Sequence, residues 1–114
     1  MYAALFETKS WMGEKKHIVK GKDVAGLIDD FEEVQSLGCL VRMGRGQEGP
    51  EGQKQLNKLE DILDKRDNGT ITVEELLELD IDLSVGKIKC SVVIEGDDAI
   101  EQLKAQYPDA RCPW

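Results

Sequence analysis

The feature that most constrains the fold of this chain is an apolar stripe with helical spacing between residues 24 and 34. Its members recur every three or four positions, with acidic residues between them; they are Val24, Leu27, Ile28, Phe31 and Val34. A stripe of this period predicts an amphipathic helix that must bury one face. Asp23 is placed to cap its first turn, and Gly38 is expected to end it.

Segments on both sides of this helix alternate apolar with polar residues, which predicts β-strands that supply the surface the helix covers. Residues 2–9 and 16–20 are expected to pair as a hairpin. Residues 39–43 and 87–94 predict two further strands. In the last strand, one face is expected to carry Ile88, Cys90, Val92 and Ile94.

The remaining segments predict helices joined by a glycine-rich linker. Residues 44–52 contain four glycines and predict a flexible loop, and residues 51–65 predict a second helix. A short helix is expected over 73–79, and Asp97 or Asp98 caps a final helix that ends at Gln106. The predicted order is β-β-α-β-α-α-β-α in one domain, residues 1–114. This is an α+β fold: a small, mostly antiparallel or mixed four-stranded sheet with helices packed on one face.

Charge is distributed unevenly along the chain. Of the net charge of −8, residues 1–57 contribute −1 and residues 58–114 contribute −7. We call residues 58–82 the acidic band, because nine acidic residues there face only three basic ones. Such a surface favours a basic protein partner and argues against direct binding of nucleic acid or a membrane surface, which are both anionic.

Residues 64–75 resemble the calcium loop of an EF-hand. The likeness rests on oxygen-bearing residues at loop positions 1, 5, 7, 9 and 12 and on Gly69 at position 6, where that loop turns sharply. It implies one weak Ca²⁺ site, with affinity on the order of millimolar, whose ligands are Asp64, Asn68, Thr70, Thr72 and Glu75. Arg66 stands at position 3, where the family has a ligand, and the chain has no second loop of this kind.

A metal-free interpretation explains the same residues, and we favour it. Residues 67–69 form a strong turn signal, because Asn and Gly tolerate a positive φ. Thr72 and Glu75 stand three positions apart, as in a capping box at the start of a helix. The segment is then a connector between two helices and needs no cofactor.

Other candidate chemistry is sparse. Residues 44–49 spell G-x-G-x-x-G, but acidic residues stand where a phosphate would bind. His17 is the only histidine, and Cys39, Cys90 and Cys112 form no Cys-x-x-Cys pair. We expect free thiols in a reducing, cytoplasmic setting, with Cys112 the most reactive. No signal peptide or membrane-spanning run is evident.

Three functional hypotheses follow. The leading one is a non-catalytic interaction or regulatory module that docks a basic partner through the acidic band. Its contact residues are expected to be Asp61, Asp64, Asp67, Glu74, Glu78, Trp11 and Arg45. The alternatives are a divergent calcium-binding domain that uses residues 64–75, and a small enzyme or small-molecule binder that uses His17, Cys39 or the glycine-rich loop. The sequence leaves the oligomeric state open.

Overall fold

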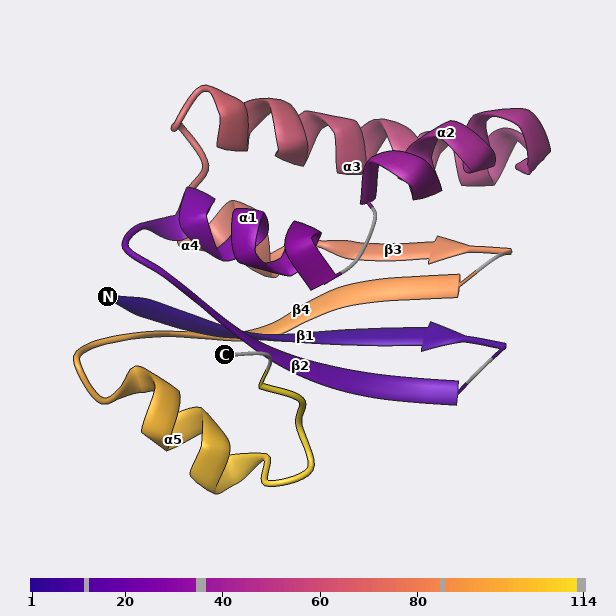
Figure 1. Ribbon diagram of the computed structural model, residues 1–114. Coiled ribbons are helices and arrows are strands. Elements are labelled where there is room, and N and C mark those ends of the chain that lie inside the picture. The colour runs from indigo at the N-terminus through magenta and orange to yellow at the C-terminus, as the bar shows by residue number, and fades with distance from the viewer. Residues whose placement is uncertain (12, 35–36, 85, 113–114) are drawn as a thin grey trace.

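The sheet of this protein consists of four antiparallel strands in the order β2-β1-β4-β3 (Figure 1). The computed structural model describes residues 1–11, 13–34, 37–84 and 86–112. The strands are β1 (Tyr2–Ser10), β2 (Gly13–Gly21), β3 (Asp80–Leu83) and β4 (Gly86–Glu95). The α+β class, the four-stranded antiparallel sheet and the hairpin between the first two strands are all confirmed.

Helices fill the chain between the two hairpins and follow the second one. They are α1 (Val24–Val34), α2 (Leu37–Gln47), α3 (Pro50–Asp67), α4 (Val73–Leu77) and α5 (Ala99–Gln106). Helices α1, α3, α4 and α5 lie where the sequence predicts them. Asp23 caps α1 as expected, since its Oδ1 accepts a hydrogen bond of 2.8 Å from the amide of Gly26.

The main core lies between the sheet and the layer formed by α1, α3 and α4. Val24, Leu27, Ile28 and Phe31 of the predicted stripe pack there, and the side chain of Val34 lies outside the described residues. The rings of Phe6 and Phe31 stack with their centroids 4.2 Å apart. Leu56 and Leu59 of α3 and Leu76 of α4 are buried in the same cluster. Burial of each such side chain contributes about 1.5–3 kcal/mol, so this layer supplies most of the apolar stabilisation.

The opposite face of the sheet is only half covered. Ala99 and Leu103 of α5 pack against Ala3, Leu5 and Ile18 to form a second, smaller core. Figure 1 shows α5 on the other side of the sheet from α3, so helices cover both faces and not the single face predicted. Beyond Leu5 and Ile18, none of the described helices covers this face of the strands.

A β-bulge in β4 explains a second correction. Leu5 pairs with Val92 and Phe6 pairs with Cys90, so Ser91 is an extra residue that shifts the register. The bulge turns Val92 and Ile94 toward α5, whereas Ile88 and Cys90 face the main core. These four residues therefore do not share one face, as strict alternation predicted.

The strand predicted over residues 39–43 is wrong, because helix α2 covers them and β3 is the remaining strand of the sheet. Gly38 also lies in α2 and does not end α1 there. The flexible loop predicted over residues 44–52 is reduced to Glu48 and Gly49 between α2 and α3. The physical reason is close helix packing: a Cβ on the buried Gly44 would lie 2.8 Å from Cδ1 of Leu56.

Candidate functional site

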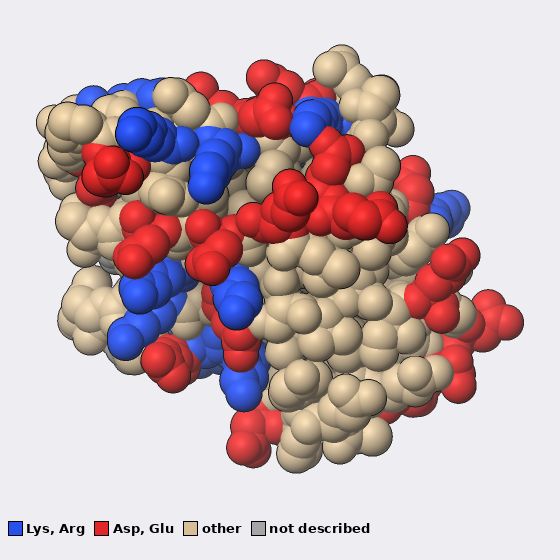
Figure 2. Space-filling model, turned by 180° about the vertical axis from the view of Figure 1, so that it is seen from behind, with Lys and Arg blue, Asp and Glu red and all other residues tan. Residues whose placement is uncertain are grey.

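The acidic band extends from α3 through α4 to β3 and is largely open to solvent. Figure 2 shows acidic side chains forming a band across this side of the molecule. The five predicted contact residues of the band are all exposed: Asp61, Asp64, Asp67, Glu74 and Glu78. Lys65 pairs with Asp61 at 3.2 Å, and Arg66 Nε pairs with Asp67 at 2.9 Å. The other three carboxylates form no ion pair with any residue that the structure describes.

Helix α3 divides four of these five residues between two depressions, and Glu74 lines neither of them. One of about 350 Å³ lies between α3 and α4, and its lining includes Asp61, Ile62 and Glu78. The other, of about 320 Å³, includes Asp64 and Asp67 beside Val41 of α2. The structure therefore brings Asp61 and Glu78 together and separates them from the other pair.

The two further contact residues predicted from sequence lie elsewhere. Arg45 is held at the α2–α3 contact, where its guanidinium donates hydrogen bonds to Glu60 Oε2 at 2.5 Å and Gln53 Oε1 at 3.0 Å. Trp11 is 91% exposed at the tip of the β1–β2 hairpin. It lines a depression of about 200 Å³ with residues of the β3–β4 turn, and none of the five acids above takes part.

The segment with the calcium-loop pattern has the geometry of a turn followed by a capped helix. Helix α3 continues to Asp67, so Asp64 is helical, and Gly69 takes the predicted positive φ of 69°. Thr72 Oγ1 accepts a hydrogen bond from the Glu75 amide, and Glu75 Oε1 accepts one from the Thr72 amide, both at 3.2 Å. This is the capping box that the sequence predicted for α4.

The Glu75 carboxylate also has a cationic partner. Lys65 donates a hydrogen bond to Glu75, and this contact, together with bonds from Thr72, holds the pKa of Glu75 below its ordinary value. Arg66, at loop position 3, is mostly buried and pairs with Glu32, Asp29 and Asp67. No group of three acidic, histidine or cysteine residues suited to a metal ion occurs within the described residues. Calcium binding stays a prediction, and an ion at Glu75 would have to displace Lys65.

His17 and Cys90 are structural in their surroundings. His17 is buried, forms a hydrogen bond of 3.2 Å with Thr8 Oγ1, and meets the ring of Phe31 edge-on at 5.9 Å. Burial, and then the charges of Arg111 and Lys15, lower its pKa. Burial raises the pKa of the Cys90 thiol to about 12. Cys112 is half-buried rather than exposed, and the side chain of Cys39 lies outside the described residues.

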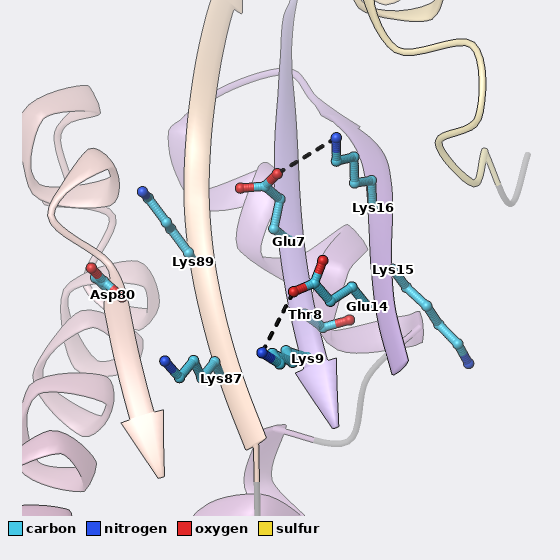
Figure 3. A pocket seen from close by; sticks show the side chains of 9 residues that line it. All are labelled: Glu7, Thr8, Lys9, Glu14, Lys15, Lys16, Asp80, Lys87 and Lys89. Atoms are coloured by element: carbon cyan, nitrogen blue, oxygen red, sulfur yellow. Dashed lines mark ion pairs between the residues drawn. The ribbon is translucent and has the colours of Figure 1, made fainter. Parts of the chain in front are cut away.

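Sequence reasoning missed a group of lysines on the uncovered half of the sheet. We call it the lysine face and define it by Lys9, Lys16, Lys87 and Lys89. They lie around a depression of about 330 Å³ whose lining also includes Glu7, Glu14, Asp80, Thr8 and Lys15. Figure 3 shows these side chains rising from β1, β2, β3 and β4, with Lys15 directed away over the edge of β2.

The ion pairs on this face are long and exposed. Lys9 lies 3.6 Å from Glu14, Lys16 lies 3.9 Å from Glu7, and Lys87 lies 3.4 Å from Asp82. Lys89 has no ion-pair partner among the described residues. The alternation of Lys87 and Lys89 with buried residues was the available signal, but only the sheet order brings β4 beside Lys9 of β1.

Fold and surface together define the class: an α+β protein with an acidic band on its helical layer and a lysine face on its sheet. Comparison of the chain with protein-family models, curated proteins and solved structures gave no match. In the described parts of the chain, no helix combines the length and the apolar composition that crossing a bilayer requires.

Proposed function

We propose that this protein is a non-catalytic interaction module that docks a basic protein surface through the acidic band. The observation that carries the proposal is the set of exposed carboxylates Asp64, Glu74 and Glu78, which have no ion-pair partner among the described residues. Their charge is therefore available to a partner. Complementary charge of this kind mainly speeds encounter and excludes wrong partners.

The depression between α3 and α4 suits a lysine or arginine side chain of that partner. Its lining combines the apolar side chain of Ile62 with the carboxylates of Asp61 and Glu78. Long basic side chains bury their methylene groups on apolar surface while their charged end stays solvated or paired. Because Lys65 already pairs with Asp61 and Glu75, Glu78 is the carboxylate in this depression left for the partner.

The surroundings of the titratable core residues support a role without catalysis. His17 is engaged by Thr8 and Phe31 and has a lowered pKa, so it contributes to packing. The Cys90 thiol, with a pKa of about 12, is protonated at neutral pH and is a poor nucleophile. Both residues act as parts of the core.

The proposal is tested by binding of a fluorescein-labelled decapeptide of alternating lysine and serine, followed by fluorescence anisotropy in 50 mM salt. The variant Asp64→Lys/Glu74→Lys/Glu78→Lys is expected to weaken binding at least about tenfold. The matched control reverses three exposed acids elsewhere, Asp97→Lys/Glu101→Lys/Asp109→Lys, and so changes the net charge equally. Thermal melts verify that both variants fold.

Equal loss in both variants would mean that the peptide senses only net charge, and the proposed surface would be wrong. Selective loss in the first variant supports it. A basic protein retained from lysate by the native and control proteins, but not by the first variant, would then identify the partner.

A further inference from the structure

We propose that the lysine face and the exposed Trp11 form a second docking surface, of opposite charge to the acidic band, which binds an acidic segment of a protein partner. The surface exists because the strands extend past the cover of α5. On this face, Leu5 of β1 is buried under α5, but Glu7 and Lys9 further along the same strand face solvent. The exposed part of a four-stranded sheet is left without a helix over it.

The charge of this surface is positive in an otherwise acidic molecule. Four lysines (Lys9, Lys16, Lys87 and Lys89) face the depression together with three acids, and Lys15 points away from it, whereas the whole chain has a net charge of −8. Its ion pairs, at 3.4–3.9 Å, join side chains that are all at least one-third exposed. Pairs of this kind contribute about 0–1 kcal/mol, so an incoming carboxylate can replace the acidic partners of Lys9, Lys16 and Lys87. At Lys89 it has no ion-pair partner among the described residues to displace.

Trp11 provides an apolar anchor at the end of the same surface. Its depression shares Lys9 and Lys87 with the lysine face, so the two are continuous. The two hairpin tips lie close together there: a Cβ on Gly86 would lie 2.5 Å from the carbonyl oxygen of Lys9. Exposed tryptophan is enriched among residues that dominate protein interfaces. An acidic segment with one apolar residue therefore matches both parts of the surface.

The acidic residues within the lysine face favour a protein over a nucleic acid as the ligand of this surface. Glu7 already accepts a hydrogen bond from Ser91, but Glu14 and Asp80 lie exposed within the lining. A peptide supplies backbone N–H groups and hydroxyls that can donate to these carboxylates. A phosphodiester backbone supplies only negative charge and acceptors there, and the overall charge of the molecule repels a long polyanion.

The test uses a fluorescein-labelled decapeptide in which five glutamates alternate with four serines and one leucine. Anisotropy in 50 mM salt is expected to show saturable binding by the full-length protein. Lys87→Glu/Lys89→Glu should weaken it at least about tenfold, and Trp11→Ala should weaken it about threefold or more. The matched control, Lys54→Glu/Lys58→Glu, reverses two exposed lysines of α3 and should stay within about twofold.

Lys87→Gln/Lys89→Gln provides a milder second variant in case the charge reversal impairs folding, and it should also weaken binding. Absence of saturable binding, or equal loss in the α3 control, would overturn the proposal. A decathymidylate that binds more tightly than the peptide, and loses affinity in the same variants, would also overturn it by assigning the surface to nucleic acid. None of these results depends on the acidic band, since the basic-peptide experiment uses different variants and a probe of opposite charge.

Discussion

The two faces of the sheet use the same strands and reach different results. On the main-core face, burial extends from Ala4 and Phe6 of β1 to Ile88 of β4 and Leu83 of β3, under the helical layer. On the other face, β1 changes from Ala3 and Leu5 to Glu7 and Lys9 halfway along its length, and helical cover ends there. The point along β1 where alternation loses its apolar member therefore marks the boundary between the core and the proposed docking surface.

The difference between the two faces of the sheet is tested most strongly by truncating one buried side chain on each face. Phe31→Ala should lower the free energy of unfolding by about 3–5 kcal/mol, because it removes the ring stacked on Phe6 and leaves a cavity. Leu103→Ala, in the smaller core under α5, should cost about 2–3 kcal/mol. Urea unfolding monitored by circular dichroism measures both.

Leu77→Ala is the control for these truncations, since Leu77 is 42% exposed. Its change should stay within about 0.5 kcal/mol. A cost for Leu103→Ala equal to or above that of Phe31→Ala would show that the α5 face contributes as much as the helical layer, and the comparison would fail.

The pH dependence of stability tests whether His17 of β2 is part of the main core. Its pKa is lowered in the folded protein by burial and by Arg111 and Lys15, so the folded state binds a proton less readily than the unfolded chain. Stability should therefore be intact above the ordinary pKa of about 6.5 and fall as the pH drops from there toward 5, by at most about 1.4 kcal/mol per pH unit.

Urea unfolding at pH 7.5, 6.5, 5.8 and 5.0 measures this slope. His17→Gln removes the titrating group, so it should be less stable at neutral pH but flatter across the same interval. An unchanged slope in that variant would assign the pH dependence to other groups.

The sequence could predict those parts of the fold that depend on local periodicity and capping. The stripe of α1, the first hairpin and the Thr72–Glu75 capping box need only neighbouring residues. Helix α2 could not be predicted in this way, because its glycines favour a loop when only neighbouring residues are considered, and the contact of Gly44 with Leu56 of α3 is seen only in the fold. Strict alternation likewise fails at Ser91, where the extra residue exchanges the faces of β4.

The same limit applies to the two charged surfaces, since only the one formed by neighbouring residues could be predicted from the sequence. Composition alone predicted an acidic band, because its residues are concentrated in one stretch of the chain. The lysine face joins Lys9 of β1 to Lys87 and Lys89 of β4, and that contact exists only through pairing across the sheet.

The capping box at Thr72 tests whether α4 contributes to the stability of the helical layer. Thr72→Ala removes the acceptor for the Glu75 amide and should cost about 1 kcal/mol. Thr72→Ser keeps the hydroxyl and should stay close to the native value. Thermal melts of the three proteins suffice, and equal stability of native protein and Thr72→Ala would mean that the capping box contributes nothing measurable.

The smallest expected effect comes from adding calcium to the 64–75 segment. In the structure Lys65 and Thr72 both engage Glu75, so an ion would have to displace an ammonium group and break the cap of α4. Calorimetric titration of metal-stripped protein at physiological salt should show no saturable heat, and millimolar calcium should leave the melting temperature unchanged. One bound ion that is lost in Glu75→Gln would contradict this expectation. It would make the 64–75 segment a ligand site within the helical layer.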